Sequence, residues 1–220
     1  SILHNRPCYK ETFYGIRTHR CIQMTPALNQ CTQNCLFCWR FQGFTETYLK
    51  VVDDPVQIVE GSIEAQRKLI SGYGGNPDAD QQKLREAYNP RHVAISLRLL
   101  VPLISRGWER LNKTLELLPS LDTRKVIRHT LLKGWNMEQI DEYARLDLKA
   151  DPHFIEPKGY VYVGYSRERV TKDSMPSHED IRNFSRKLSD LTGYYFSDER
   201  EDSRVVLLEK YRNFPKISSV

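Results

Sequence analysis

Cysteine is absent from most of this chain. The 220 residues contain five cysteines, and none lies beyond residue 38. Long apolar runs are also missing, since no stretch approaches the roughly 20 residues of a membrane-spanning helix, and the opening SILHNRPCYK lacks the apolar core of a signal peptide. We therefore expect a cytoplasmic protein with no membrane partner. In that compartment, clustered cysteines bind metal more often than they form disulfides.

The chain also lacks a strong charge of either sign. Its formal net charge is +5, an excess that permits a nucleic-acid partner without requiring one. The composition is 40% hydrophobic and 28% charged, as in an ordinary globular protein. We find no internal repeat and no low-complexity tract, and the length suits a single domain with its own core.

Helix and strand signals alternate after an irregular first segment, residues 1–50. Helices are predicted after the Asp54-Pro55 cap, over residues 108–118, from Asn136 with Gln139 completing a capping box, and from Ser177 to Gly193. Strands are predicted over residues 92–97, 123–132, 153–165, where Pro157 interrupts the run, and 203–210. This alternation predicts an α/β fold with a largely parallel sheet.

Three of the cysteines share one short stretch, CTQNCLFCWRF. Cys31, Cys35 and Cys38 are spaced C-x3-C-x2-C, one ligand short of four. Structural zinc takes four ligands, so a histidine such as His19 would have to complete a zinc site. Clusters with four cysteines are closed electron carriers, whereas three thiolates can hold three iron corners of a [4Fe-4S] cube and leave the fourth open. An open iron can bind S-adenosylmethionine, and an electron from the cluster can then break its sulfonium carbon–sulfur bond.

This spacing is the motif of the radical S-adenosylmethionine enzymes. The longer stretch CYKETFYGIRTHRCIQMTPALNQCTQNCLFCWR closely resembles the archaeal tRNA 4-demethylwyosine synthases. Four later segments resemble the same family: EAQRKLISGYGGNP, NPRHVAISL, GWERLNKTLELL and FIEPKGYVYVGYSR. The resemblance implies a partial (β/α) TIM-like barrel with an N-terminal cluster-binding extension. It implies one domain over residues 1–220, with residues 1–30 as the auxiliary-cluster segment and residues 31–38 as the radical cluster loop.

The resemblance also implies an activity in wybutosine biosynthesis. A lyase of this family joins N1-methylguanosine in phenylalanine tRNA to two carbons of pyruvate and forms 4-demethylwyosine, with S-adenosylmethionine and an electron donor. The implied radical [4Fe-4S] cluster is held by Cys31, Cys35 and Cys38. A second [4Fe-4S] cluster would include Cys8 and Cys21, which could otherwise be small buried residues. We expect a monomer.

Three further residues are candidates for the site. Lys10 matches a family lysine that holds pyruvate as a Schiff base, although it could equally be a solvated surface lysine. Phe37 matches the aromatic residue beside the adenine of S-adenosylmethionine, or it is a core residue beneath the loop. Asn136 follows a predicted strand, where parallel α/β barrels collect functional residues, so it is a weaker candidate for cofactor binding. His129 is expected to be a satisfied core or surface histidine.

The run KGYVYVGYSR alternates aromatic and cationic side chains: Lys158, Tyr160, Tyr162, Tyr165 and Arg167. Such residues can stack a base and hold phosphate. One packed and one solvated strand face explain the same spacing more simply, and the spacing alone favours that interpretation.

Two departures from the family pattern predict that the chain lacks some segments. The family's Gly-Glu-Pro stretch should follow HVAISL, where RLL follows instead, and a third auxiliary cysteine would lie upstream of Ser1. Two other functions stay open at this point. One is another radical enzyme, such as an activase or a small-molecule carbon–carbon bond former, and the other is a zinc-stabilised RNA-binding module without catalysis.

Overall fold

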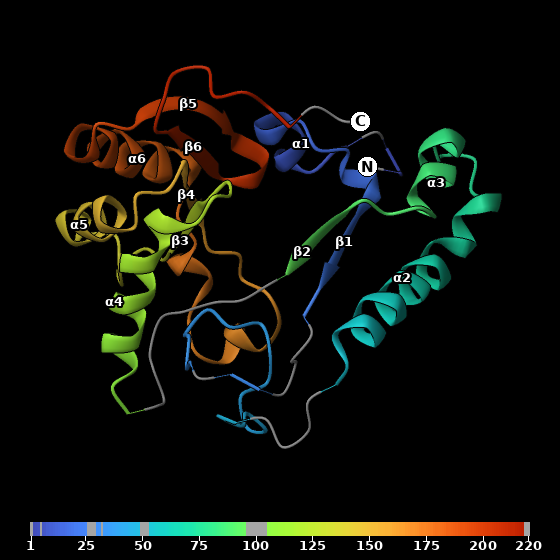
Figure 1. Ribbon diagram of the computed structural model, residues 1–220, viewed down its shortest axis with the longest axis horizontal. Coiled ribbons are helices and arrows are strands. Elements are labelled where there is room, and N and C mark those ends of the chain that lie inside the picture. Colours follow the sequence, from blue (N-terminus) through green and yellow to red (C-terminus); the bar gives the residue numbers. More distant parts are fainter. Residues whose placement is uncertain are drawn as a thin grey trace. The chain divides into compact units, whose positions relative to one another are not determined.

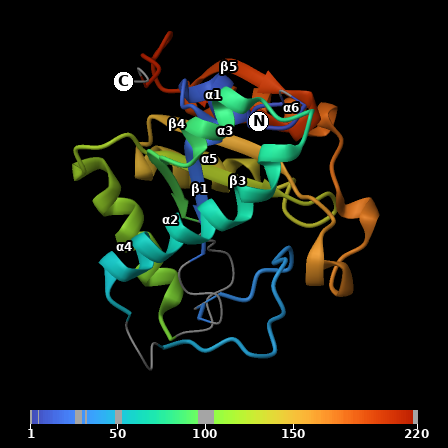
Figure 2. The same ribbon diagram turned by 90° about the vertical axis from the view of Figure 1, so that its right-hand side faces the viewer.

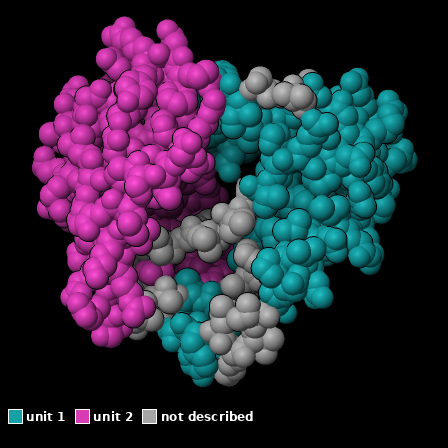
Figure 3. Space-filling model, in the orientation of Figure 1, with its two compact units in different colours: residues 1–32, 45–99, 216–220 teal, residues 33–44, 100–215 magenta. Residues whose placement is uncertain are grey.

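The computed structural model describes residues 2–4, 6–25, 30–31, 33–48, 53–95 and 105–217. The chain divides into two compact units (Figure 3). Unit 1 comprises residues 1–32, 45–99 and 216–220, and unit 2 comprises residues 33–44 and 100–215. The single domain expected over residues 1–220 stays a prediction.

Unit 1 is built on a short parallel sheet with three helices (Figures 1 and 2). Its elements are α1 (Tyr9–Tyr14), β1 (Cys21–Met24), α2 (Pro55–Ser71), α3 (Gln81–Ala87) and β2 (His92–Ile95). β1 pairs with β2 in parallel, with Cys21 opposite His92. The expectation that residues 1–50 are irregular is wrong for α1 and β1. These elements have six and four residues, too few for a helical or strand period to show in the sequence.

Local capping signals in unit 1 are confirmed. The Asp54 carboxylate accepts hydrogen bonds from the N–H groups of Val56 and Gln57, at 2.8 and 3.1 Å, and Pro55 opens α2. The sequence interpretation did not predict α3, which Asp80 caps in the same way. The predicted strand 92–97 is confirmed as β2 up to residue 95. Its end and the RLL junction lie outside the described residues.

Unit 2 contains a four-stranded mixed sheet and three helices. Its elements are α4 (Gly107–Leu117), β3 (Val126–Leu131), α5 (Ile140–Ala150), β4 (Phe154–Gly159), α6 (His178–Thr192), β5 (Tyr195–Arg200) and β6 (Val205–Glu209). The strand order is β3-β4-β6-β5, with β3 and β4 parallel and the other two pairs antiparallel. The prediction of a largely parallel sheet is therefore wrong for β5 and β6. These strands are joined by a short turn with Arg204 at a left-handed φ of 44°, which leaves no room for a crossover helix. Neither sheet closes into a barrel within the described residues.

The core of unit 2 lies between α6 and this sheet. Ile181 and Leu188 on α6 are fully buried against Ile155 of β4 and Leu208 of β6. β4 is nearly continuously buried, as expected for a strand covered on both faces. It tolerates Pro157 because its pairing with β6 is interrupted between residues 155 and 158, so the missing N–H falls in that gap.

The caps of α6 agree with the sequence, whereas the proposed cap at Asn136 does not. Ser177 and Asp180 form a reciprocal capping box, and Gly193 ends α6 with a φ of 76°. α5, however, begins at Ile140 after Gln139. Asn136 uses its side chain in the preceding loop instead, so the capping-box prediction there is wrong.

Among the helices of the described ranges, none combines the length and the apolarity needed to cross a membrane.

Candidate functional site

Cys35 and Cys38 form a buried turn in unit 2, called here the cysteine turn (residues 35–38). The N–H of Cys38 donates to the carbonyl oxygen of Cys35 at 3.1 Å, and the two residues are 4% and 8% exposed. They pack in one apolar cluster with Phe37, Leu132 and Tyr160. Leu132 directly follows β3 and Tyr160 directly follows β4, so the turn lies at the carboxyl ends of two parallel strands. Ligand sites of parallel α/β proteins gather at this edge.

Two side chains from outside the cysteine turn hold its backbone. Arg169 donates from Nε to the carbonyl oxygen of Leu36 at 3.2 Å, and its terminal nitrogen donates to the carbonyl oxygen of Cys38. Gln42 donates to the carbonyl oxygen of Cys35 at 3.1 Å. Three carbonyls of the turn are therefore satisfied by side chains. Sequence reasoning missed both residues. For Arg169, no local pattern marks a side chain that bonds a backbone more than 130 residues away.

Gly164 allows its segment to approach the backbone of Trp39, the residue that follows the cysteine turn. Gly164 has a φ of 59°, and a Cβ there would collide with the carbonyl oxygen of Trp39. The next residue, Tyr165, donates its N–H to that oxygen at 3.0 Å. Only glycine allows this backbone contact.

In unit 1, one hydrogen-bonded group ties together the segments that carry Cys8 and Cys21. Cys8 is exposed and precedes α1, and its N–H donates to the Thr18 hydroxyl at 3.4 Å. Thr18 in turn donates to the Glu11 carboxylate, from its hydroxyl at 2.7 Å and its N–H at 3.1 Å. Cys21 is half-buried and opens β1, three residues after Thr18. Lys10 is half-buried in the first turn of α1, two residues after Cys8.

The described residues do not show an assembled metal-ligand set. Cys31 belongs to unit 1, where its N–H donates to the carbonyl oxygen of Glu46 at 2.9 Å. No group of three or more His, Cys, Asp or Glu residues within the described ranges is placed to hold a metal ion. Cys35 and Cys38 nevertheless suit an iron–sulfur cluster in donor chemistry, because they present thiols from one fixed turn in apolar surroundings. The histidine of the zinc alternative, His19, bonds Glu86 through Nε2 at 2.7 Å.

Phe37 belongs to the cysteine turn, and Asn136 bonds Leu132, which packs in the same apolar cluster. Phe37 is 4% exposed, inside the apolar cluster. Asn136 accepts from the N–H of Leu132 at 2.7 Å and donates to the carbonyl oxygen of Thr130 at 3.0 Å, which closes the loop after β3. Burial raises the pKa of Tyr143 to about 12, against the effect of its hydrogen bond with Asn136. The roles of Phe37 and Asn136 towards a cofactor stay predictions.

The prediction that His129 is a satisfied histidine is confirmed. His129 lies 2.8 and 2.9 Å from the two carboxylate oxygens of Asp147, and the Asp147 side chain is fully buried. This pair belongs to the core of unit 2.

The run from Lys158 to Arg167 does not continue as a strand. β4 ends at Gly159, and Lys158 donates to the carbonyl oxygen of Ser203 at 2.6 Å. Tyr160 is buried, with its hydroxyl 2.6 Å from that of Ser166. The prediction of one strand with a packed and a solvated face is thus wrong beyond residue 159. After β4 the chain leaves the sheet and forms a 3-10 helix at Gly164–Glu168.

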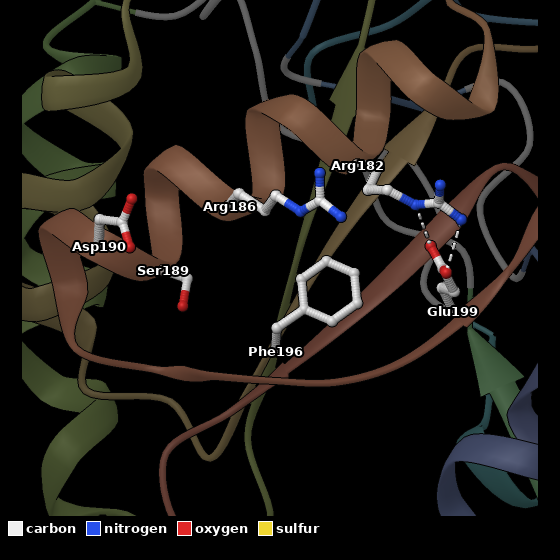
Figure 4. Close-up of a pocket in the computed structure, with 6 residues that line it drawn as sticks. All are labelled: Arg182, Arg186, Ser189, Asp190, Phe196 and Glu199. Carbon is white, nitrogen blue, oxygen red and sulfur yellow. Dashed lines mark hydrogen bonds and ion pairs between the residues drawn. The ribbon is translucent and has the colours of Figure 1, made fainter.

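A surface hollow on α6 and β5 contains none of the predicted site residues (Figure 4). It is lined by Arg182, Arg186, Ser189, Asp190, Phe196 and Glu199. Arg182 donates to both carboxylate oxygens of Glu199, at 2.7 and 2.9 Å. The Arg182 hydrogen bond holds the pKa of Glu199 below its usual value. The Arg182–Glu199 ion pair joins α6 to β5, and both residues are far in sequence from every cysteine.

Comparison with known proteins gives one consistent result. A family model described as wyosine base formation matches residues 149–210. The S-adenosyl-L-methionine-dependent tRNA 4-demethylwyosine synthase of Pyrococcus horikoshii is 42% identical, over 94% of this chain and 80% of that protein. The enzyme of the same name from Methanocaldococcus jannaschii is 32% identical, over 94% and 86%. The alignment with the first of these spans 273 residues, so that relative has aligned positions with no counterpart in these 220 residues.

Solved structures give the same answer at the level of the fold. A structure of TYW1 with a lysine-pyruvate adduct bound matches with a TM-score of 0.82 and 30% identity, over 94% of this chain and 86% of that one. A crystal structure of archaeal TYW1 matches with a TM-score of 0.75 and 27% identity, over 98% and 87%. The fold is therefore the mixed α/β fold of these proteins. Since a relative 42% identical is matched over most of its length, the chain belongs to the family of S-adenosyl-L-methionine-dependent tRNA 4-demethylwyosine synthases.

Proposed function

We propose that this protein converts N1-methylguanosine in phenylalanine tRNA, together with pyruvate, to 4-demethylwyosine in wybutosine biosynthesis. The enzyme would be a carbon–carbon lyase of the radical S-adenosylmethionine class that acts as a monomer with a separate electron donor. The observation that carries the proposal is the 42% identity to the synthase of Pyrococcus horikoshii over 94% of the chain. A further radical enzyme or a zinc-stabilised RNA-binding module has no such support.

The radical cluster is assigned to Cys31, Cys35 and Cys38. When bound there, a [4Fe-4S] cluster supplies the single electron that cleaves S-adenosylmethionine. The protein's own contribution is to fix two of the thiols in the cysteine turn, through Arg169 and Gln42, and to surround them with apolar side chains. Phe37 and Asn136 are proposed to contact the cofactor. The proposed architecture is a partial (β/α) barrel over residues 1–220 in which some segments of the relatives are missing, as the 273-residue alignment supports.

The second cluster is assigned to a set that includes Cys8 and Cys21, with residues 1–30 as its segment. Lys10 is proposed to hold pyruvate as an imine. The bound lysine-pyruvate adduct in a related structure supports a lysine in this role, and Lys10 is two residues from Cys8. The hydrogen bonds of Glu11 and Thr18 keep the two cysteine segments together.

The test is a product assay with anaerobically purified protein. Phenylalanine tRNA bearing N1-methylguanosine, pyruvate, S-adenosylmethionine and dithionite should yield a tricyclic base, detected by mass spectrometry of the nucleosides. The matched control is the same tRNA without the methyl group, which should yield none. Iron and labile sulfide should be present in the protein. Zinc without labile sulfide, or no tricyclic base despite a full iron content, would contradict the proposal.

A further inference from the structure

Four large aromatic side chains of unit 2 are exposed next to the cysteine turn. Trp39, Phe41, Phe44 and Tyr165 are 41, 45, 78 and 45% exposed. We call them the aromatic platform. The first of them directly follows Cys38, and none belongs to the buried cluster around the two thiols. Side chains of this kind bury large apolar areas when a partner covers them.

Within the platform, the ring of Phe41 contacts the rings of Phe44 and Tyr165. The centroid of Phe41 lies 5.1 Å from that of Phe44, with the rings at 66°, and 5.1 Å from that of Tyr165, with the rings at 55°. The hydrogen bond from the Tyr165 N–H to the carbonyl oxygen of Trp39 joins the two segments. The aromatic platform therefore combines two segments that are distant in sequence, residues 39–44 and residue 165.

Two glycines make this arrangement possible. Gly164 admits the close approach of its backbone to Trp39, and a Cβ at Gly43 would collide with the ring of Phe41. Phe41 therefore contacts Phe44 and Tyr165 before any partner binds, which lowers the entropy that binding would cost.

Two arginines belong to the segments that carry the platform. Arg40 lies between Trp39 and Phe41 in the sequence, and Arg167 is two residues after Tyr165 and is followed by the exposed Glu168. Arg167 is exposed, and its guanidinium carbon lies 5.3 Å from the ring centroid of Tyr162. Exposed rings beside cations match a ligand that has flat aromatic faces and negative charges, which is the chemistry of a single-stranded nucleic acid.

We propose that the aromatic platform stacks unpaired nucleotides of the tRNA substrate that flank the modified guanosine, while Arg167 contacts a nearby phosphate. This inference rests on the proposed function, since it takes the tRNA from that reaction. It adds the surface by which the substrate is held. An apolar protein partner would use the rings but would not require the arginines.

The test measures the affinity of the iron-loaded full chain for methylated phenylalanine tRNA by filter binding. Replacing one stacking ring, in Phe44→Ala or Tyr165→Ala, should weaken binding by about tenfold. Phe44→Leu should bind as weakly as Phe44→Ala, whereas Phe44→Trp should keep the wild-type affinity, because stacking needs an aromatic face. The matched control is Trp108→Ala, a change of a half-exposed aromatic residue on α4, which should change the affinity by less than about twofold.

Salt dependence separates the rings from the arginine. Arg167→Ala should reduce the log–log salt slope of binding by about one, while Phe44→Ala should leave the slope unchanged and lower the affinity at every salt concentration. The fluorescence of a 2-aminopurine base placed beside the methylated guanosine should be quenched when wild type binds, and less so when Phe44→Ala binds. The iron content of each variant verifies its fold.

Each outcome decides between the two proposals. Wild-type affinity in Phe44→Ala and Tyr165→Ala would overturn the platform, and formation of the tricyclic base by the same variants would leave the proposed function standing. Absence of the tricyclic base in wild type that binds the tRNA through these rings would overturn the proposed function alone. A change in self-association of the variants with no change in tRNA binding would reassign the platform to a protein contact.

Discussion

The two cysteine-bearing regions of this protein are held in place by different means. The cysteine turn of unit 2 is buried, and the side chains of Gln42 and the distant Arg169 bond its carbonyls. In unit 1, Cys8 is exposed and Cys21 half-buried, and their segments are joined by the local group of Glu11 and Thr18. A buried turn protects its ligands from water, whereas an open segment lets a small substrate approach. The difference supports the proposal of one region for radical chemistry and one for pyruvate.

The sharpest test of this comparison replaces one cysteine in each region. Cys38→Ala should abolish 5′-deoxyadenosine formation, because two thiols do not keep a cluster with one open iron in place. Cys8→Ala should retain it and lose the tricyclic base instead. Both products are measured by liquid chromatography after anaerobic reduction. Equal loss of 5′-deoxyadenosine in the two variants would mean that the regions do not differ in task.

Lys10 sharpens the comparison within unit 1. Lys10→Ala should form no tricyclic base and should not be labelled by radioactive pyruvate and borohydride, because the imine nitrogen is gone. Cleavage of S-adenosylmethionine should persist. The matched control is Lys68→Ala, an exposed lysine of α2 in the same unit. Labelling of Lys10→Ala at the wild-type level would place the imine on another lysine.

Arg169 tests how much the cysteine turn depends on its distant support. Arg169→Ala should lower the free energy of unfolding by about 1.5–3 kcal/mol, the usual cost of losing hydrogen bonds from a charged donor. It should also speed the loss of iron to a chelator. Arg169→Lys should recover only part of both, since lysine cannot bond two carbonyls with one planar group. The control is Arg167→Ala, where the arginine is exposed. Unchanged iron loss in Arg169→Ala would show that the turn holds itself.

The smallest effect is expected away from both regions, at the ion pair of α6 and β5. Glu199→Gln should lower the free energy of unfolding by about 1 kcal/mol without changing the iron content. The pKa of Glu199 is held below its usual 4.5, first by Arg182 and then by His178. Its contribution is therefore complete above pH 4.5 and is lost as the pH falls below that value.

Chemical denaturation between pH 3 and 7 measures this contribution. The difference between wild type and Glu199→Gln should shrink on acidification. A difference that grows on acidification would contradict the assigned direction.

Local signals in the sequence predicted local structure well. Asp54-Pro55 at α2 and Ser177 with Gly193 at α6 act within a few residues of themselves, so their caps could be read without the fold. Asn136 misled the interpretation for the opposite reason. An asparagine side chain can bond a helix terminus or a loop backbone, and only the position of β3 made the loop bonds available.

The sequence by itself determined the family and predicted the chemistry of the cysteines. Three thiols at fixed spacing and a long specific match to relatives need no coordinates, because both are properties of residue order. The tertiary structure decided which side chains support the cysteine turn, how β5 and β6 run, and which rings form the aromatic platform. These depend on contacts between residues that are far apart in the chain. Such contacts form only when burial of the core brings the segments together, and no local pattern records them.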